Sequence, residues 1–321
     1  MEIHSDGSVT PCCRYWNIIG EFGNYFYSTF EEVWNVSNAK RMRKSCWNGD
    51  YDYCNLDLCF PEFISKEGLI SNFDTKKGTF TLYPKYVKFC HDFSCNVSCI
   101  TCRDEIITND RKLTERLDSF IMPFFLPMLK NAEIVALSGS GELFSSKHSM
   151  NLIKEIINAY PEIKFELHSN GILCNENNCI NVFGNLEKIS YVFFSIHAAT
   201  EETYKKIVKN GNFAKCMENV EWLSLQKKLS VIKGMQIGLC VHSQNYHEMK
   251  MFLQKAISLD IDASFWLYQP WGTKMDNNYD EYSVWNIHHP QYKDLLKLLK
   301  DPIFDDSHCI MIGALDNLRK L

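Results

Sequence analysis

Short apolar runs alternate with stretches of helical periodicity from residue 86 onward. The strand-like runs cover residues 86–93, 133–137, 164–168, 189–195, 234–241 and 263–268. Apolar residues recur at helical spacing over 151–160, where Pro161 ends the pattern, and again over 213–229 and 248–259. This alternation predicts βαβ units with a parallel sheet, so the expected fold class is α/β. About six strands are fewer than the eight of a closed barrel, and we expect a partial (β/α)6 TIM-like barrel.

The first eighty residues show a different pattern and form a cysteine-rich unit. A turn signal over residues 5–13 leads into a short strand, and residues 30–43 have the spacing of a short basic helix. The stretch 72–79 is the expected linker. The sequence therefore predicts a small domain over 1–75, a barrel over 80–290 and a helical extension over 291–321.

Composition excludes several classes of protein. The chain has 321 residues, 45% of them hydrophobic, and a net charge of −5, so no basic field indicates nucleic-acid binding. No apolar run is long enough to span a membrane, because Pro123 and Pro127 interrupt the stretch from Phe120. The start of the chain lacks the basic and apolar parts of a signal peptide, which favours a reducing, cytoplasmic location. The 14 cysteines are therefore expected to be metal ligands and buried thiols.

Three of these cysteines lie within eight residues, in the run Cys95-Asn-Val-Ser-Cys99-Ile-Thr-Cys102. They follow a predicted strand, at the end where barrels place their chemistry. Three thiolates on a four-iron cluster leave one iron open to substrate or cofactor. A structural zinc site would need a fourth ligand, and no second Cys-x-x-Cys pair follows. Inert core cysteines are the other alternative and suit scattered positions better.

This triplet resembles the signature of the radical S-adenosylmethionine (radical SAM) superfamily, and later elements follow in the family's order. Gly139-Ser-Gly-Glu142 resembles the Gly-Gly-Glu-Pro element, and Ser169-Asn-Gly171 resembles the Thr-Asn-Gly end of the third strand. Residues 189–197 resemble the fourth strand. The resemblance covers about residues 85–270. Departures are Thr101 before the last cysteine, Leu143 in place of proline, His197 in place of aspartate, and Val208, followed by Lys209, in place of arginine.

The resemblance implies a specific cofactor chemistry. A 4Fe-4S cluster on Cys95, Cys99 and Cys102 would bind S-adenosylmethionine (SAM) through its open iron, and cleavage would give a 5′-deoxyadenosyl radical that abstracts hydrogen. Glu142 is suited to hold the methionine amine, and Gly139 and Gly141 allow close approach of the backbone. The residues expected to bind the cofactor are Gly139, Ser140, Gly141, Glu142, Asn170, Ser195 and His197.

The amino-terminal unit resembles the SPASM domain, which carries auxiliary iron–sulfur clusters in many radical SAM enzymes. The matching points are Asp6-Gly7, Pro11-Cys12, Ile19-Gly20 and residues 31–35. That domain normally follows the barrel, and here it comes first. A second auxiliary cluster is expected on Cys12, Cys46, Cys54 and Cys59, with Cys13 as the alternative to Cys12 and Cys309 as a further candidate. Zinc on the same cysteines remains an alternative.

Three functions follow from these resemblances. The leading hypothesis is an enzyme, an oxidoreductase by class, that modifies a peptide or protein side chain. The second is a radical enzyme that acts on a small molecule such as a sugar or nucleotide derivative. The third is an iron–sulfur scaffold without radical chemistry. The expected partners are a peptide or protein substrate and an electron donor such as flavodoxin or ferredoxin, with no nucleic acid and no membrane.

Overall fold

The computed structural model describes residues 1–13, 18–55, 73–74, 76–77, 79–80, 83–137, 139–270 and 272–320. The chain forms two compact units, which are described separately. Unit 1 consists of Met1–Phe93, Asn109–Ser140 and Lys147–Phe165, and unit 2 consists of Ser94–Thr108, Gly141–Ser146 and Glu166–Leu321. Two short segments, 94–108 and 141–146, thus leave unit 1 and return to it.

The amino-terminal strands of unit 1 join the strands of the α/β region. β1 (Glu2–His4), β2 (Ser8–Thr10) and β3 (Gly23–Asn24) pair antiparallel in that order. β1 also pairs in parallel with β6 (Tyr86–Cys90), with Ile3 opposite Phe89. β6 pairs in parallel with β8 (Ile134–Leu137). The cysteine-rich segment is therefore continuous with the α/β sheet of this unit through main-chain hydrogen bonds.

The helices of unit 1 begin and end at recognisable caps. α1 (Phe30–Trp34) starts with a capping box, in which Thr29 and Glu32 satisfy each other's backbone N–H groups. α2 (Ser37–Asn48) ends at Gly49, whose φ of 84° is the left-handed conformation of a helix C-terminus. The other elements are β4 (Phe73–Asp74), β5 (Thr79–Phe80), α3 (Arg111–Asp118), the π-helical turn η2 (Ile121–Phe125), α4 (Leu126–Met128) and α5 (Lys147–Ala159).

Aromatic side chains fill part of the core of unit 1. The Tyr25 ring lies 5.2 Å from Phe120, 5.7 Å from Phe124 and 5.1 Å from Phe125, measured between ring centroids. Phe125 is fully buried. The apolar run that begins at Phe120 thus packs its phenylalanine rings against Tyr25, the residue after β3.

Unit 2 is built on parallel strands. β10 (Ile189–Ser195), β12 (Gly234–Val241), β13 (Asp262–Leu267) and β14 (Cys309–Met311) pair in parallel in that order. Residues 235–241 of β12 are all buried, as expected for a parallel strand that is covered on both faces. β9 (Lys164–Ser169) starts in unit 1 and ends in unit 2.

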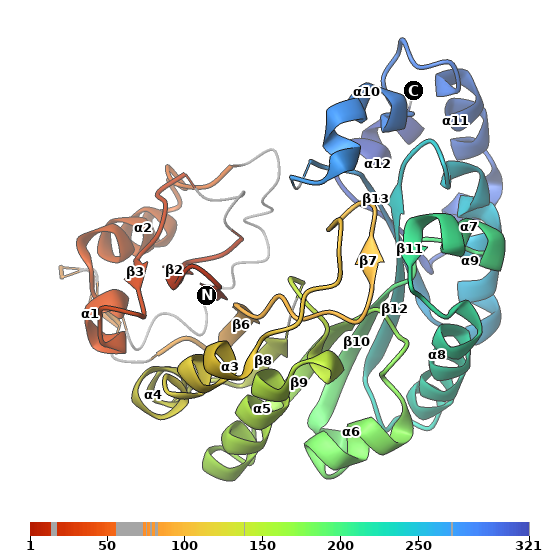
Figure 1. The fold of residues 1–321 in the computed structure, drawn as a ribbon. Coiled ribbons are helices and arrows are strands. Elements are labelled where there is room, and N and C mark those ends of the chain that lie inside the picture. Colours follow the sequence, from red (N-terminus) through yellow and green to blue (C-terminus); the bar gives the residue numbers. More distant parts are fainter. Residues whose placement is uncertain are drawn as a thin grey trace. The chain divides into compact units, whose positions relative to one another are not determined.

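The helices of unit 2 alternate with these strands along the chain. α6 (Glu176–Phe183), α7 (Glu201–Ile207), α8 (Phe213–Lys228) and α9 (Met249–Leu259) connect them, and α8 and α9 pack against β12 and β13 (Figure 1). β7 (Ser98–Cys99) and β11 (Val208–Lys209) form a separate antiparallel pair. The remaining elements are η3 (Leu143–Ser145), η4 (Leu186–Lys188), η5 (Tyr246–Glu248), η6 (Lys274–Asn278), α10 (Tyr279–Tyr282), α11 (Tyr292–Leu299), η7 (Pro302–Asp305) and α12 (Ala314–Arg319).

The predicted α/β architecture with six strand–helix repeats is confirmed. The six strands are β6, β8, β9, β10, β12 and β13, and each overlaps the run that predicted it. The stretch 291–321, predicted as helical, also contains β14 beside β13. The predicted boundary between residues 75 and 80 falls where the structure describes the chain only in part, and it stays a prediction. Among the described residues, no helix has the length and apolarity that a membrane span requires.

Gly238 in β12 generates a prediction about packing in unit 2. A Cβ atom at this position would lie 2.7 Å from Cζ3 of Trp266 and would also collide with the Phe193 ring. Gly238→Ala should therefore lower the free energy of unfolding by about 1–3 kcal/mol, measured by urea denaturation. The double variant Gly238→Ala/Phe193→Leu should recover part of that loss. An unchanged unfolding midpoint in the single variant would contradict the packing described here.

Candidate functional site

The three clustered cysteines lie on segment 94–108 of unit 2. Cys95 is buried, Cys99 is half-buried and Cys102 is exposed, and all three are thiols without a disulfide. Backbone hydrogen bonds shape the loop: Cys95 N donates to Ile107 O at 2.8 Å, and Cys102 N donates to Cys99 O at 2.9 Å. The first bond closes the base of the loop, and the second turns the chain between the last two thiols.

The short pair β7–β11 holds the middle of this loop. Cys99 pairs with Val208, and Ile100 N donates to Ile207 O at 3.0 Å. The guanidinium of Arg103 donates to Cys102 Sγ at 3.4 Å. The segment after α7 therefore fixes Cys99, and a cation lies beside Cys102.

The thiols influence one another electrostatically. Burial raises the pKa of Cys99, and Cys102 and Cys95 raise it further because each additional thiolate repels the others. Burial also raises the pKa of Cys95, which Arg103 partly offsets. Burial therefore keeps Cys95 and Cys99 protonated in spite of Arg103, and a bound metal would favour their thiolate forms.

The three thiols of the loop are predicted to hold a four-iron cluster. Over the described parts of the chain, no group of three or more His, Cys, Asp or Glu side chains is placed to hold one metal ion. In a four-iron cluster each thiolate binds a different iron, so the sulfurs surround a larger body. Three neighbouring thiols on one loop fit that chemistry, and their role as ligands stays a prediction.

Several hydrogen-bond donors surround the Glu142 carboxylate. It is 2% exposed, and its carboxylate accepts hydrogen bonds from the Ser169 hydroxyl at 3.0 Å to each oxygen and from Asn170 N at 2.8 Å. Phe144 N donates at 3.4 Å, at the start of η3. Burial raises the pKa of Glu142 to about 7, although these donors oppose the shift. A positive group beside the carboxylate would offset the cost of burying its charge.

Asn170 connects the carboxylate with the cysteine loop. Its backbone N–H donates to Glu142, while its side-chain Nδ2 donates to Asn96 Oδ1 at 2.9 Å and to Cys95 Sγ at 3.8 Å. Glu142 N donates to Ser94 O at 2.7 Å. Two predicted site residues and the first cysteine therefore belong to one hydrogen-bonded network in unit 2.

His197 is hydrogen-bonded to the segment around Cys240 in unit 2. Its Nδ1 accepts a hydrogen bond from Cys240 N at 3.1 Å, and its carbonyl accepts one from Asn245 Nδ2 at 2.9 Å. It has a φ of 66°, a strained conformation for a residue other than glycine. Burial lowers its pKa to about 4, so the ring is neutral at pH 7. Ser195, the last residue of β10, pairs with Gly238 of β12.

The glycine-rich turn before Glu142 is divided between the units. Gly139 and Ser140 end the second segment of unit 1, and Gly141 begins the second segment of unit 2. Gly139 has a φ of 117°, which a residue with a Cβ rarely adopts. The predicted turn is thus present, and contact of Gly139, Ser140 and Gly141 with a cofactor stays a prediction.

The predicted amino-terminal ligands are described only in part. Cys12, Cys13, Cys46 and Cys54 are half-buried in unit 1. Cys46 lies in the last turn of α2, where its carbonyl accepts from Gly49 N at 3.2 Å. Cys59 lies outside the described residues. The ligand set of the second cluster stays a prediction.

No role was assigned from the sequence to two residues of unit 2, Ser169 and Tyr204. Ser169 is the main side-chain donor to Glu142, and its only signal is its place before Asn170 at a strand end. Tyr204 in α7 is fully buried, and its hydroxyl has no hydrogen-bond partner in the described part of the chain. Burial raises the pKa of Tyr204, and Cys216 and Cys99 raise it further, so the hydroxyl keeps its proton. Nothing local in the sequence distinguishes Tyr204 from an ordinary core tyrosine.

Comparison with known proteins identifies the amino-terminal part of the chain. Residues 1–60 match the family model of SPASM, an iron–sulfur cluster-binding domain. This match confirms the predicted amino-terminal SPASM-like domain. No protein of curated function matches the sequence.

Several solved structures of low sequence identity are also similar. Streptococcus suis SuiB bound to precursor peptide SuiA is 14% identical with a TM-score of 0.48, over 72% of this chain and 49% of that chain. Methylornithine synthase (PylB) is 10% identical with a TM-score of 0.39, over 86% and 68% of the two chains. TYW1 with a lysine-pyruvate adduct is 18% identical with a TM-score of 0.38, over 67% and 70%. The chain spans about half the length of the SuiB chains.

The donors to Glu142 generate a pH-dependent prediction. Ser169→Ala removes the hydroxyl that donates to both carboxylate oxygens, and it should lower the free energy of unfolding by about 1–3 kcal/mol at pH 8. The wild-type pKa of Glu142 is about 7, so below that pH the carboxyl is protonated and the loss should shrink. Urea unfolding at pH 6 and pH 8 measures both values. Ser258→Ala, which removes an exposed hydroxyl on α9, should show no such pH dependence.

Proposed function

We propose that this chain is a radical SAM enzyme that modifies a peptide or protein side chain. In this proposal Cys95, Cys99 and Cys102 hold a 4Fe-4S cluster, and SAM binds at the open iron beside Glu142. When bound, the cluster and SAM supply a carbon-centred radical that removes a hydrogen atom from the substrate. The chain's own residues bind, orient and shield the reactants.

The observation that supports this proposal best is the position of Asn170. Its side chain donates to the cysteine loop, and its backbone donates to the Glu142 carboxylate. A group bound at the thiols and a cationic group bound at Glu142 would therefore be close neighbours. SAM carries both an amine and a carboxylate on its methionine part, which suits a site with one iron ligand position and one buried acid.

The neutral state of nearby side chains also supports the proposal. His197 is neutral at pH 7 and Tyr204 keeps its proton, because both are buried. Ile100, between Cys99 and Cys102, packs against a cluster that contains Cys240 and Tyr268. An apolar surface beside the loop would exclude water, which protects a radical from side reactions.

The SPASM match favours a peptide or protein substrate over a small molecule. Residues 1–60 match SPASM, an iron–sulfur cluster-binding domain, and the domain that this unit resembles is named for its peptide-maturing members. A second cluster in this domain would shuttle an electron or bind substrate. A search for a short precursor-peptide gene beside this one, and anaerobic incubation of the enzyme with candidate peptides and small molecules followed by mass spectrometry, test the substrate class. A mass change in a small molecule but in no peptide would count against it.

Metal content gives the first test of the cofactor assignment. Anaerobically reconstituted protein should hold about eight iron atoms per chain if both clusters form, and about four if only the cysteine-loop cluster forms. Changing Cys95, Cys99 and Cys102 together to Ala should remove about four irons and all SAM cleavage. Residual iron and sulfide in this triple variant would show the second cluster, whereas zinc without sulfide would overturn it. Full SAM cleavage in the triple variant would falsify the assignment of the loop.

Glu142 gives the second test, which reports on SAM binding. Glu142→Gln keeps the shape of the side chain and removes its charge, so SAM affinity should fall about tenfold to a hundredfold. Wild-type affinity should also weaken as the pH falls below about 7, because the carboxyl becomes protonated. The Gln variant should lack this pH dependence. Equilibrium binding and iron content are measured on the same preparation, and unchanged affinity with full iron would contradict the role of Glu142.

A further inference from the structure

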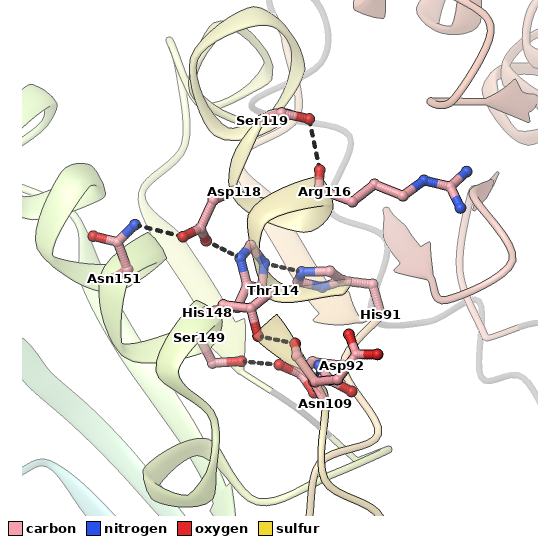
Figure 2. A network of polar contacts seen from close by, with 11 residues as sticks. His91, Asp92, Asn109, Thr114, Arg116, Asp118, Ser119, His148, Ser149 and Asn151 are labelled. Carbon is pink, nitrogen blue, oxygen red and sulfur yellow. Dashed lines mark hydrogen bonds and ion pairs between the residues drawn. The ribbon is translucent and has the colours of Figure 1, made fainter. Parts of the chain in front are cut away.

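A buried polar network in unit 1 contains residues beside the points where two segments of the chain leave and rejoin that unit. We call these points the roots of the segments, and the segments carry the candidate site. The chain leaves unit 1 after Phe93 and returns at Asn109, and it leaves again after Ser140 and returns at Lys147. Segment 94–108 carries the three cysteines, and segment 141–146 carries Glu142. The network in Figure 2 contains His91 and Asp92 before the first segment, Asn109 after it, and His148 and Ser149 after the second.

Asp92 is the residue that joins three of these four roots. It is 7% exposed. Its Oδ1 accepts a hydrogen bond from Asn109 Nδ2 at 3.0 Å, and its Oδ2 accepts one from the Ser149 hydroxyl at 3.2 Å. One carboxylate therefore holds the exit and the return of the cysteine segment together and ties both to the return of the Glu142 segment.

A second set of hydrogen bonds, through His148, also connects the residues at these roots. His148 Nδ1 lies 2.5 Å from Asp118 Oδ1, and its Nε2 lies 2.6 Å from His91 Nε2 (Figure 2). Asn151 donates to the other oxygen of Asp118 at 3.3 Å. His91, the residue before Asp92, is thereby tied to α5 and to α3.

The proton positions in this chain follow from its acceptors. Asp118 accepts from His148 Nδ1–H, and in the tautomer that carries only this proton the Nε2 of His148 is an acceptor. His91 must then donate from Nε2–H, which leaves its buried Nδ1 as an acceptor without a partner among the described residues. Burial lowers the pKa of His91 to about 3, so it is neutral at pH 7. In this arrangement the N–H groups that join the two histidines and Asp118 each have an acceptor. His91 is held by its hydrogen bond to His148 of α5, which is in turn bonded to Asp118 of α3.

We propose that Asp92 is a positioning residue that sets the placement of the cysteine loop relative to Glu142. The inference rests on the proposed function, because it assumes that these two segments bind a cluster and SAM. In unit 2 the segments are also joined by the hydrogen bond from Glu142 N to Ser94 O at 2.7 Å. Asp92 fixes the same segments at their roots, so its loss would free their ends while leaving every proposed ligand in place.

The test compares Asp92→Ala with Asp92→Asn. The alanine variant removes both acceptors, whereas the asparagine variant still accepts from Asn109 and can donate to the Ser149 hydroxyl. In protein without metal, amide hydrogen exchange over residues 94–108 and 141–146 should be about tenfold faster in Asp92→Ala and close to wild type in Asp92→Asn. After reconstitution, SAM affinity per bound iron should be about tenfold weaker in Asp92→Ala and restored in Asp92→Asn.

Controls separate a positioning role from a merely structural one. Thr114→Val removes a hydroxyl that donates to Asp110 O at 2.9 Å at the edge of the network, and it should change neither measurement. If Asp92→Ala does not fold, Asn109→Ala and Ser149→Ala remove one connection each and should each show a smaller effect of the same kind.

The outcomes also distinguish this inference from the proposed function. Wild-type protein that binds neither iron nor SAM would sink the proposed function, whatever the exchange data show. Wild-type protein that binds both, with Asp92→Ala equal to it in SAM affinity per iron and in exchange over the two segments, would overturn the role of Asp92 alone. A lower unfolding temperature with unchanged SAM affinity per iron would overturn it as well.

Discussion

The burial of the Glu142 carboxylate is the constraint on which the candidate site depends. An acid that is 2% exposed needs several donors, and the chain supplies them from Ser169 and Asn170 at the end of β9 and from Phe144. Even with these donors its pKa stays near 7, so the free protein holds the group close to the point of losing its charge. A cation bound beside the carboxylate would offset the remaining cost of burying its charge.

The order and ranges of the strands and helices could be predicted because each depends on the pattern of apolar residues within a short stretch of sequence. Parallel strands such as β10 and β12 are short apolar runs, and α8 and α9 repeat apolar residues at helical spacing, so their ranges agreed closely with the prediction. β14 has three residues, too few to show a period, and the carboxyl-terminal stretch was therefore expected to be helical. The clustered cysteines could be singled out because they lie within eight residues, and Glu142 because Gly139-Ser-Gly-Glu142 resembles a family motif.

The rest of the site could not be predicted because its contacts join distant positions. His91 and His148 are 57 residues apart, as are Asp92 and Ser149, and neither pair has any periodicity in the sequence. Ser169 and Tyr204 are ordinary residues of a strand and a helix until the fold gives them neighbours. His197 was predicted to contact the cofactor, which stays a prediction, and its hydrogen bonds to Cys240 and Asn245 join positions more than forty residues apart.

The pairing of β1 with β6 has a consequence for how the protein folds. β1 pairs with β2 along one edge, but Ile3 lies opposite Phe89 along the other, so this second edge has no partner until more than eighty further residues have been synthesised. Contacts of such long sequence separation form slowly, because the chain must close a large loop before any contact is gained. β6 runs directly into His91, Asp92 and the cysteine segment. The strand that leads into the cysteine segment therefore also completes the pairing of β1, which links the ordering of the amino-terminal strands to that of the chain just before the candidate cluster site.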